Sequence, residues 1–168
     1  MCARYTLVAR LELLRKRFRL SAAEVEELVP RYNIAPSQPA PVVIEDGGAA
    51  LRLFRWGLIP SWSKEARIAH KLINARSETL ADKASFRSAF KSRRCLILAD
   101  GFYEWPEAAG GGKPRPRRLT LAGGEPFAMA GLWESWNSPE GETRRTFTIV
   151  TAAANPSVRP LHERMPAI

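Results

Sequence analysis

Residues 95–105 read CLILADGFYEW and contain two short stretches that are both typical of β-strands. Residues 95–99 are apolar throughout, which favours a buried strand. Residues 101–105 follow almost directly and are rich in aromatic side chains, which strands accommodate well. We therefore predict two successive strands here. Cys95 begins the first of them, and we expect its thiol to be an inert part of the core.

The rest of the chain adds more strands than helices. Apolar patterning predicts further strands at residues 3–9, 42–44, 51–56, 117–122, 126–133 and 146–151, with turns at 45–48 and 137–142. Helices are predicted over residues 10–19, near 83–92, and from Ser21, where residues 21–24 (SAAE) form a capping box. Prolines within residues 30–41 predict an extended stretch, and residues 108–116 (AAGGGKPRP) predict a mobile hairpin tip.

These elements, with hairpin-like spacings, predict an α+β or mostly-β domain. The chain has 168 residues and shows no shift in composition, so we expect a single domain over residues 1–168. It is 45% apolar and 26% charged, which excludes a disordered chain. No apolar run approaches the roughly 20 residues of a membrane helix, which excludes a spanning segment of that kind.

The charge balance is strongly basic. The chain carries 26 lysines and arginines against 17 acidic residues, for a net charge of +9 and a pI of about 10.2. Such a charge favours an anionic partner, most commonly nucleic acid, although many proteins are basic without one. The arginine-rich stretch 4–19 also suggests an organellar presequence, but its glutamate and its lack of serine indicate that it is part of the fold.

Cys2 occupies a position with special chemistry. Removal of Met1 by an aminopeptidase would leave a terminal cysteine, whose α-amine and thiol have ordinary pKa values of about 7.7–8.0 and about 8.5. Such an aminothiol condenses with an aldehyde to an imine, and the thiol then closes a five-membered thiazolidine. The alternative is that cysteine stands at position 2 by accident.

Three other places hold polar residues suited to a reactive site. Asn74 and Arg76 share one face if the chain is extended, which suits an anion or a reacting carbonyl, whereas the alternative is a solvated turn. Glu104 stands among three aromatic residues and is a candidate for proton transfer, unless it lies on the surface. His162, one of two histidines, is a candidate catalytic imidazole in a loop or else a surface residue.

Aromatic and cationic residues are neighbours in residues 31–36 (RYNIAP) and 54–62 (FRWGLIPSW). This pattern is typical of proteins that stack unpaired bases on aromatic rings, and it makes Trp56 and Trp62 candidate DNA contacts. The alternative is that both tryptophans belong to the core. Two cysteines and two histidines at scattered spacings match no zinc site, and no phosphate-binding or dinucleotide motif is present, so we expect neither a metal nor a cofactor.

Taken in order, these motifs resemble the SOS-response-associated peptidase (SRAP) family of abasic-site shielding proteins. The motifs that carry the resemblance are Met1-Cys2-x-Arg4-Tyr5, residues 32–36 (YNIAP), 56–60 (WGLIP), 73–79 (INARSET), 101–105 (GFYEW), 149–154 (IVTAAA) and His162-x-Arg164-Met165-Pro166. They run from the first residues to the last, in the family's order and at similar spacing, which makes the resemblance specific.

The resemblance implies an α+β fold around an irregular antiparallel β-barrel with peripheral short helices and a positively charged groove. The catalytic residues that it implies are Cys2 as nucleophile, with Asn74, Glu104 and His162. The DNA contacts that it implies are Arg4 and Arg76 on phosphates, with Pro36 and Trp56 in segments that line the groove. In the family, the terminal cysteine links covalently to an abasic site in single-stranded DNA.

We therefore expect a DNA-damage protein of the bacterial cytoplasm, associated with the nucleoid. It would act as a monomer and capture abasic sites in single-stranded DNA covalently, with a possible second activity, the autoproteolytic release of Met1. Two alternatives stay open. The first is a cysteine peptidase that acts on other proteins with His162 as base, and the second is a single-stranded-DNA-binding module without chemistry.

Two departures from the family pattern are visible. Ala3 stands where the family usually has glycine, and its Cβ would crowd the site or exclude a positive φ. Family members usually continue beyond the motif that contains Met165 and Pro166, so we expect this chain to lack the family's C-terminal segment.

Overall fold

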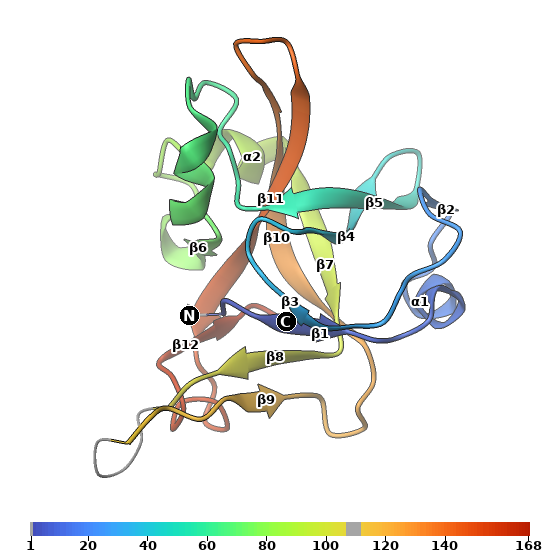
Figure 1. The fold of residues 1–168 in the computed structure, drawn as a ribbon, viewed down its shortest axis with the longest axis vertical. Coiled ribbons are helices and arrows are strands. Elements are labelled where there is room, and N and C mark those ends of the chain that lie inside the picture. Colours follow the sequence, from blue (N-terminus) through green and yellow to red (C-terminus); the bar gives the residue numbers. More distant parts are fainter. Residues whose placement is uncertain (1, 107–111) are drawn as a thin grey trace.

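The computed structural model describes residues 2–106 and 112–168, and its centre is a closed β-barrel (Figure 1). The barrel strands are β4 (Pro39–Glu45), β5 (Ala49–Trp56), β7 (Arg94–Ala99), β10 (Phe127–Asn137) and β11 (Thr143–Ala153). A second sheet contains β3 (Arg31–Ile34), β1 (Tyr5–Leu7), β8 (Gly101–Glu104) and β9 (Arg117–Leu119) in that order. The remaining elements are α1 (Leu11–Phe18), β2 (Ala22–Ala23), η1 (Ala66–Lys71), β6 (Asn74–Arg76), η2 (Ser77–Thr79), α2 (Arg87–Ser92) and β12 (Arg164–Pro166).

The barrel that we expected is confirmed, with one difference in its closure. Its strands pair antiparallel in the order β11-β10-β7-β4-β5, but β5 closes the barrel against β11 in parallel. The cause is the number of strands. When five strands alternate in direction, the first and the last point the same way, so the closing pair must be parallel.

Large apolar side chains fill the barrel interior. Trp56 stacks on Phe147 with ring centroids 6.2 Å apart, and Tyr5 meets the indole edge-on at 5.3 Å. The indole Nε1 donates a hydrogen bond to the Ile73 carbonyl at 2.8 Å. These contacts place Trp56 in the core and fix the segment that leads into β6.

Gly57 lets the chain leave β5 towards η1. Its φ is +117°, and a Cβ at this position would lie 2.8 Å from the Ala69 carbonyl oxygen in η1. Glycine is therefore needed where the two segments touch, because any side chain would force η1 away. Since η1 leads directly into β6, this close approach also sets the position of Asn74.

A buried aspartate anchors the second sheet to the barrel. Asp100 links β7 to β8, and its Oδ2 accepts the N–H groups of Val8 at 2.5 Å and Ala9 at 3.2 Å. Its Oδ1 accepts hydrogen bonds from the Thr6 hydroxyl at 2.5 Å and from Arg118 at 3.0 Å. Asp100 thus holds β1 and β9 against β8, and β1 in turn carries the N-terminus.

We expect Asp100→Asn to lower the free energy of unfolding by about 2–4 kcal/mol, because an amide cannot accept all of these hydrogen bonds and leaves Arg118 without its ion-pair partner. Urea unfolding followed by tryptophan fluorescence would measure the change. The control is Asp46→Asn, since Asp46 forms an exposed ion pair with Arg52 at 2.7 Å and should cost only about 0–1 kcal/mol. Equal effects of the two variants would contradict this role of Asp100.

Most elements predicted from the sequence have counterparts in the structure. The helix over 10–19 is confirmed as α1, the helix near 83–92 is shorter, as α2, and every predicted strand has a matching strand. Of the predicted hairpin tip at 108–116, residues 108–111 lie outside the described residues. The strands β6 and β12 were not predicted. Within the described ranges, no helix has the length and apolar character needed to cross a membrane.

The helix predicted from Ser21 is wrong. The Ser21 and Glu24 N–H groups donate to the carbonyls of Ala49 and Leu51, so this segment runs beside β5 as β2. The Glu24 carboxylate accepts the Leu53 N–H at 2.8 Å instead of capping a helix. Pairing with the barrel therefore outcompetes the local capping signal.

Candidate active site

Cys2 and Asn74 meet directly at the N-terminal end of the described chain. Cys2 precedes β1 and its side chain is 0% exposed, with Sγ 3.8 Å from the Arg4 carbonyl oxygen. Asn74, the first residue of β6, donates a hydrogen bond from Nδ2 to the Cys2 carbonyl oxygen at 2.9 Å. The Asn74 side chain therefore fixes the backbone of Cys2, although the two residues belong to separate sequence motifs.

Glu104 supplies a buried charge beside this cysteine. It ends β8, which pairs with β1, and it is 2% exposed, so the surface alternative is wrong. Burial, and secondarily the negative charge of Glu104, raise the pKa of the Cys2 thiol to about 12. The thiol is therefore protonated at neutral pH.

His162 reaches this region through β11. On one side of β11, β6 pairs Asn74 with Ile149 and Arg76 with Thr151, and on the other side β12 pairs with residues 151–153. His162 is half-buried just before β12, and its Nδ1 lies 2.9 Å from the Arg164 N–H nitrogen. Residues 149–153 of β11 therefore pair with both strands, with β6, which begins with Asn74, and with β12, which follows His162.

The predicted DNA contacts divide into surface and core residues. Arg76 is exposed, and Trp62 is 60% exposed. Arg4 and Pro36 are partly exposed, and within the described residues the buried Arg4 Nε has no hydrogen-bond acceptor. Trp56 is only 1% exposed, so its indole cannot stack on a base, and the core alternative is correct for it.

The alanine at position 3 causes no backbone strain. Among the non-glycine residues that the structure describes, only Arg19 and Ser37 have a positive φ. Ala3 therefore does not occupy a conformation that requires glycine. Elsewhere, Cys95 is buried in β7 as expected, and burial raises the pKa of its thiol. The described residues contain no group of three or more His, Cys, Asp and Glu side chains placed to hold a metal ion.

The structure adds an ion pair that the sequence did not predict. Arg164 binds Glu78 with two hydrogen bonds of 2.7 and 2.9 Å, and its Nη2 also donates to the Thr151 carbonyl at 2.7 Å. The hydrogen bonds from Arg164 lower the pKa of Glu78 to about 2. Glu78 lies in the motif at 73–79, and Arg164 lies in the motif that begins with His162. The opposite charges of these two residues were the only sign in the sequence that they pair.

This ion pair predicts a pH dependence. The pKa of Glu78 is about 2 in the folded state and about 4.3 in an unfolded chain, so the pair stabilises the fold above about pH 4.3 and less as pH falls towards 2. We expect the wild type to have a higher urea midpoint than Glu78→Gln at pH 7, with the difference shrinking between pH 5 and pH 2. Equal midpoints at pH 7 would contradict the stabilising role.

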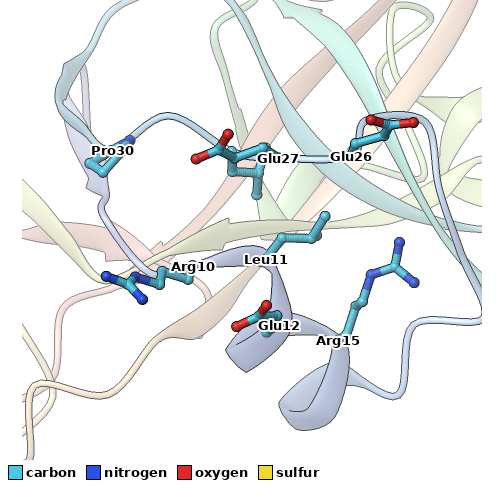
Figure 2. Close-up of a pocket in the computed structure, with 8 residues that line it drawn as sticks. Arg10, Leu11, Glu12, Arg15, Glu26, Glu27 and Pro30 are labelled. Carbon is cyan, nitrogen blue, oxygen red and sulfur yellow. The ribbon is translucent and has the colours of Figure 1, made fainter.

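A separate cavity of about 700 Å³ lies between α1 and residues 26–30 (Figure 2). Its lining residues are Arg10, Leu11, Glu12, Arg15, Glu26, Glu27, Leu28 and Pro30. Figure 1 shows α1 and β6, the strand that begins with Asn74, on opposite sides of the molecule. None of the predicted site residues lines this cavity, so it is distinct from the cluster around Cys2.

Comparisons with known proteins agree with this geometry. The family SOS response associated peptidase (SRAP) matches residues 1–168. The Bacillus subtilis protein named abasic site processing protein YoqW is 44% identical, across 100% of this chain and 75% of that protein. Abasic site processing protein HMCES of Xenopus tropicalis is 34% identical, across 83% of this chain and 50% of that protein.

Solved structures show the same fold. A crystal structure of a Bordetella bronchiseptica protein is 30% identical with a TM-score of 0.82, covering 98% of this chain and 82% of that one. A Bacteroides thetaiotaomicron protein is 26% identical with a TM-score of 0.89, covering 99% of this chain and 76% of that one.

Proposed function

Because this chain belongs to the SOS response associated peptidase (SRAP) family, we propose that it processes abasic sites in DNA by linking them covalently to Cys2. The observation that carries the proposal is the cluster at the N-terminus, where Asn74 holds the Cys2 carbonyl at 2.9 Å and the buried Glu104 acts on the Cys2 thiol. The names of the relatives as abasic site processing proteins support the same substrate.

The reaction begins once Met1 has been removed and Cys2 carries the free α-amine. An abasic deoxyribose opens to an aldehyde at C1′, and the amine attacks that carbon. The amine nitrogen loses two protons, and the former carbonyl oxygen leaves with them as water. The product is an imine. The S–H group then adds across the C=N bond, with sulfur on C1′ and hydrogen on nitrogen, and closes the thiazolidine.

The site favours attack by the amine over attack by the thiol. A thiol with a pKa of about 12 is almost entirely protonated at neutral pH, and the protonated form is a poor nucleophile. A peptidase that attacks other proteins would need a thiolate from the start. The raised pKa therefore supports the aldehyde chemistry over a general cysteine peptidase. A second proposed activity is the release of Met1: the neighbouring Glu104 takes the Cys2 thiol proton, sulfur attacks the Met1 carbonyl, the Met1–Cys2 C–N bond breaks with the nitrogen taking up the proton, and water hydrolyses the resulting thioester.

The proposed substrate is single-stranded DNA that carries an abasic site, and the net charge of +9 suits a nucleic-acid partner. Arg4 and Arg76 would hold phosphates on either side of the lesion, because both lie close in sequence to residues of the cluster. Trp62 presents an exposed ring on which a neighbouring base can stack, and the partly exposed Pro36 is proposed as a further DNA contact. We propose that the protein acts as a monomer.

A denaturing gel tests the proposal. The protein, with removal of Met1 verified by mass spectrometry, is mixed with a single-stranded oligonucleotide that carries one abasic site. We expect a shifted band that survives denaturant, with a mass equal to protein plus DNA minus one water. The control oligonucleotide carries a tetrahydrofuran analogue, which has no aldehyde and should give no band. Loss of the first band in denaturant would indicate binding without chemistry and refute the proposal.

A further inference from the structure

Trp56, the last residue of β5, lies in the core and cannot contact DNA, so the proposed reaction gives it no role. Its hydrogen bonds and ring contacts nevertheless lead to three segments of the proposed site. These segments are β1, which follows Cys2, the peptide that precedes Asn74, and the loop that carries Pro36.

The Trp56 indole holds the peptide group that precedes Asn74. Its Nε1 donates to the Ile73 carbonyl oxygen at 2.8 Å, and the Ile149 N–H donates to the same oxygen at 3.1 Å. This carbonyl and the Asn74 N–H belong to one planar peptide unit. Two donors, one from the barrel core and one from β11, therefore fix the plane of that unit and the direction in which the Asn74 side chain leaves the backbone.

The same indole packs against the strand that carries Cys2. Tyr5 lies in β1 three residues after Cys2, and its ring meets the Trp56 ring edge-on with centroids 5.3 Å apart. Stacking on Phe147, with the ring planes 10° apart, holds the indole in its orientation. Asn74 Nδ2 donates to the Cys2 carbonyl oxygen at 2.9 Å, so the segments of both partners in that hydrogen bond rest on one fixed ring.

The backbone of Trp56, in contrast to its ring, supports the loop of Pro36. The Trp56 N–H donates to the Gln38 carbonyl at 3.0 Å, and the Trp56 carbonyl accepts the Ser37 N–H at 2.8 Å. Between these partners Ser37 keeps a φ of +69°, which is uncommon for a residue with a side chain. A change confined to the indole leaves both backbone hydrogen bonds in place, so it should leave the Pro36 loop unchanged.

We propose that Trp56 is a positioning residue for the cross-linking reaction and that its indole N–H fixes Asn74 relative to Cys2. The inference rests on the proposed function. Attack on the aldehyde requires the amine nitrogen and C1′ to meet at about 3–3.5 Å with the correct alignment. Without the indole N–H, the Ile73 carbonyl keeps only its hydrogen bond from β11. The peptide can then tilt, and Asn74 no longer holds Cys2 in one place.

Replacement of the Trp56 indole by benzothiophene tests the hydrogen bond alone, because sulfur takes the place of the N–H and the bicyclic shape is kept. We expect the maximal rate of adduct formation at saturating abasic DNA to fall by about 10- to 100-fold. The matched control is the same replacement at Trp136, which is also 2% exposed or less and donates from Nε1 to the Ser63 carbonyl at 2.6 Å.

The two analogues separate positioning from general loosening of the fold. Each loses one hydrogen bond of a buried indole, so the urea midpoints should fall by similar amounts. Only the analogue at Trp56 should lower the maximal rate, and the DNA concentration at half-maximal rate should stay at the wild-type value. Equal loss of rate in both analogues would overturn the inference. A raised half-saturating concentration with an unchanged maximal rate would also overturn it, because the ring would then contact DNA.

A double-variant cycle tests whether Trp56 acts through Asn74. Asn74→Ala should slow the reaction by itself, and the benzothiophene at Trp56 should then cause no further loss. Additive losses would overturn the inference, because they would mean that the indole acts by another route.

NMR of the free protein tests the same link without DNA chemistry. In the wild type, the Asn74 side-chain amide proton that is bonded to the Cys2 carbonyl should exchange slowly with solvent. Exchange should become faster with the analogue at Trp56 and stay slow with the analogue at Trp136. Equal exchange in all three proteins would overturn the inference even if cross-linking occurs. A wild type that forms no adduct would refute the proposed function instead, and the exchange rates would still decide whether Trp56 fixes Asn74.

Discussion

Cys2→Ala is expected to form no adduct that survives denaturant, although it still reacts with the abasic aldehyde. The variant keeps a terminal α-amine once Met1 is removed, so an imine can form. It has no thiol to add across the C=N bond, and the imine hydrolyses back to aldehyde and amine. The structure supports this order of steps because Cys2 is fully buried, and burial raises the pKa of its thiol and disfavours the thiolate as the first nucleophile.

Reduction with borohydride separates the two steps. We expect a stable band from Cys2→Ala only when borohydride is present, and from the wild type with or without it. Cys95→Ala is the matched control, because Cys95 is the second buried cysteine and lies in β7, within the barrel wall. It should cross-link like the wild type. A denaturant-stable band from Cys2→Ala without reductant would reveal a different nucleophile.

The regular part of the fold could be predicted because its strands are long enough to show a pattern. The apolar run at 95–99 and the aromatic stretch at 101–105 became β7 and β8, as expected. The three-residue strands β6 and β12 are too short to carry any periodicity, and only their pairing with β11 defines them. The capping box at Ser21 led to a wrong helix prediction for the opposite reason. Its local signal is clear, but the segment pairs with β5 and forms β2 instead.

Candidate site residues could be predicted as chemical types, whereas their environments could not. Cys2, Asn74 and Glu104 stood out as polar residues in apolar or reactive contexts, and the structure brings them together. Nothing in the sequence distinguishes Trp56, which lies inside the barrel, from Trp62, which lies outside it, because both stand in the same stretch of aromatic, cationic and apolar residues at 54–62. The Glu78–Arg164 ion pair joins residues 86 positions apart and depends on the tertiary fold.

Glu104→Gln is expected to slow adduct formation by about 10²- to 10⁴-fold, the usual effect of removing a group that transfers protons. Glutamine keeps the size and shape of the side chain but cannot accept a proton from the amine or the sugar hydroxyl. The rate of band appearance in single-turnover reactions at pH 7 gives the measurement. Glu134→Gln is the control, because it alters another buried carboxylate, one paired with Arg93 at 2.9 Å in the barrel.

The same variant distinguishes the two possible nucleophiles by the sign of its effect. The negative charge of Glu104 raises the pKa of the Cys2 thiol, so Glu104→Gln lowers that pKa and increases the thiolate fraction. With a substrate whose aldehyde is already open, so that no sugar ring has to open, a thiol that attacked first would therefore react faster in the variant than in the wild type. If the amine attacks first and Glu104 moves its protons, the variant reacts more slowly. A Glu104→Gln rate above that of the wild type would thus contradict the proposed order, whereas Glu134→Gln should lower stability and leave the rate of the folded protein unchanged.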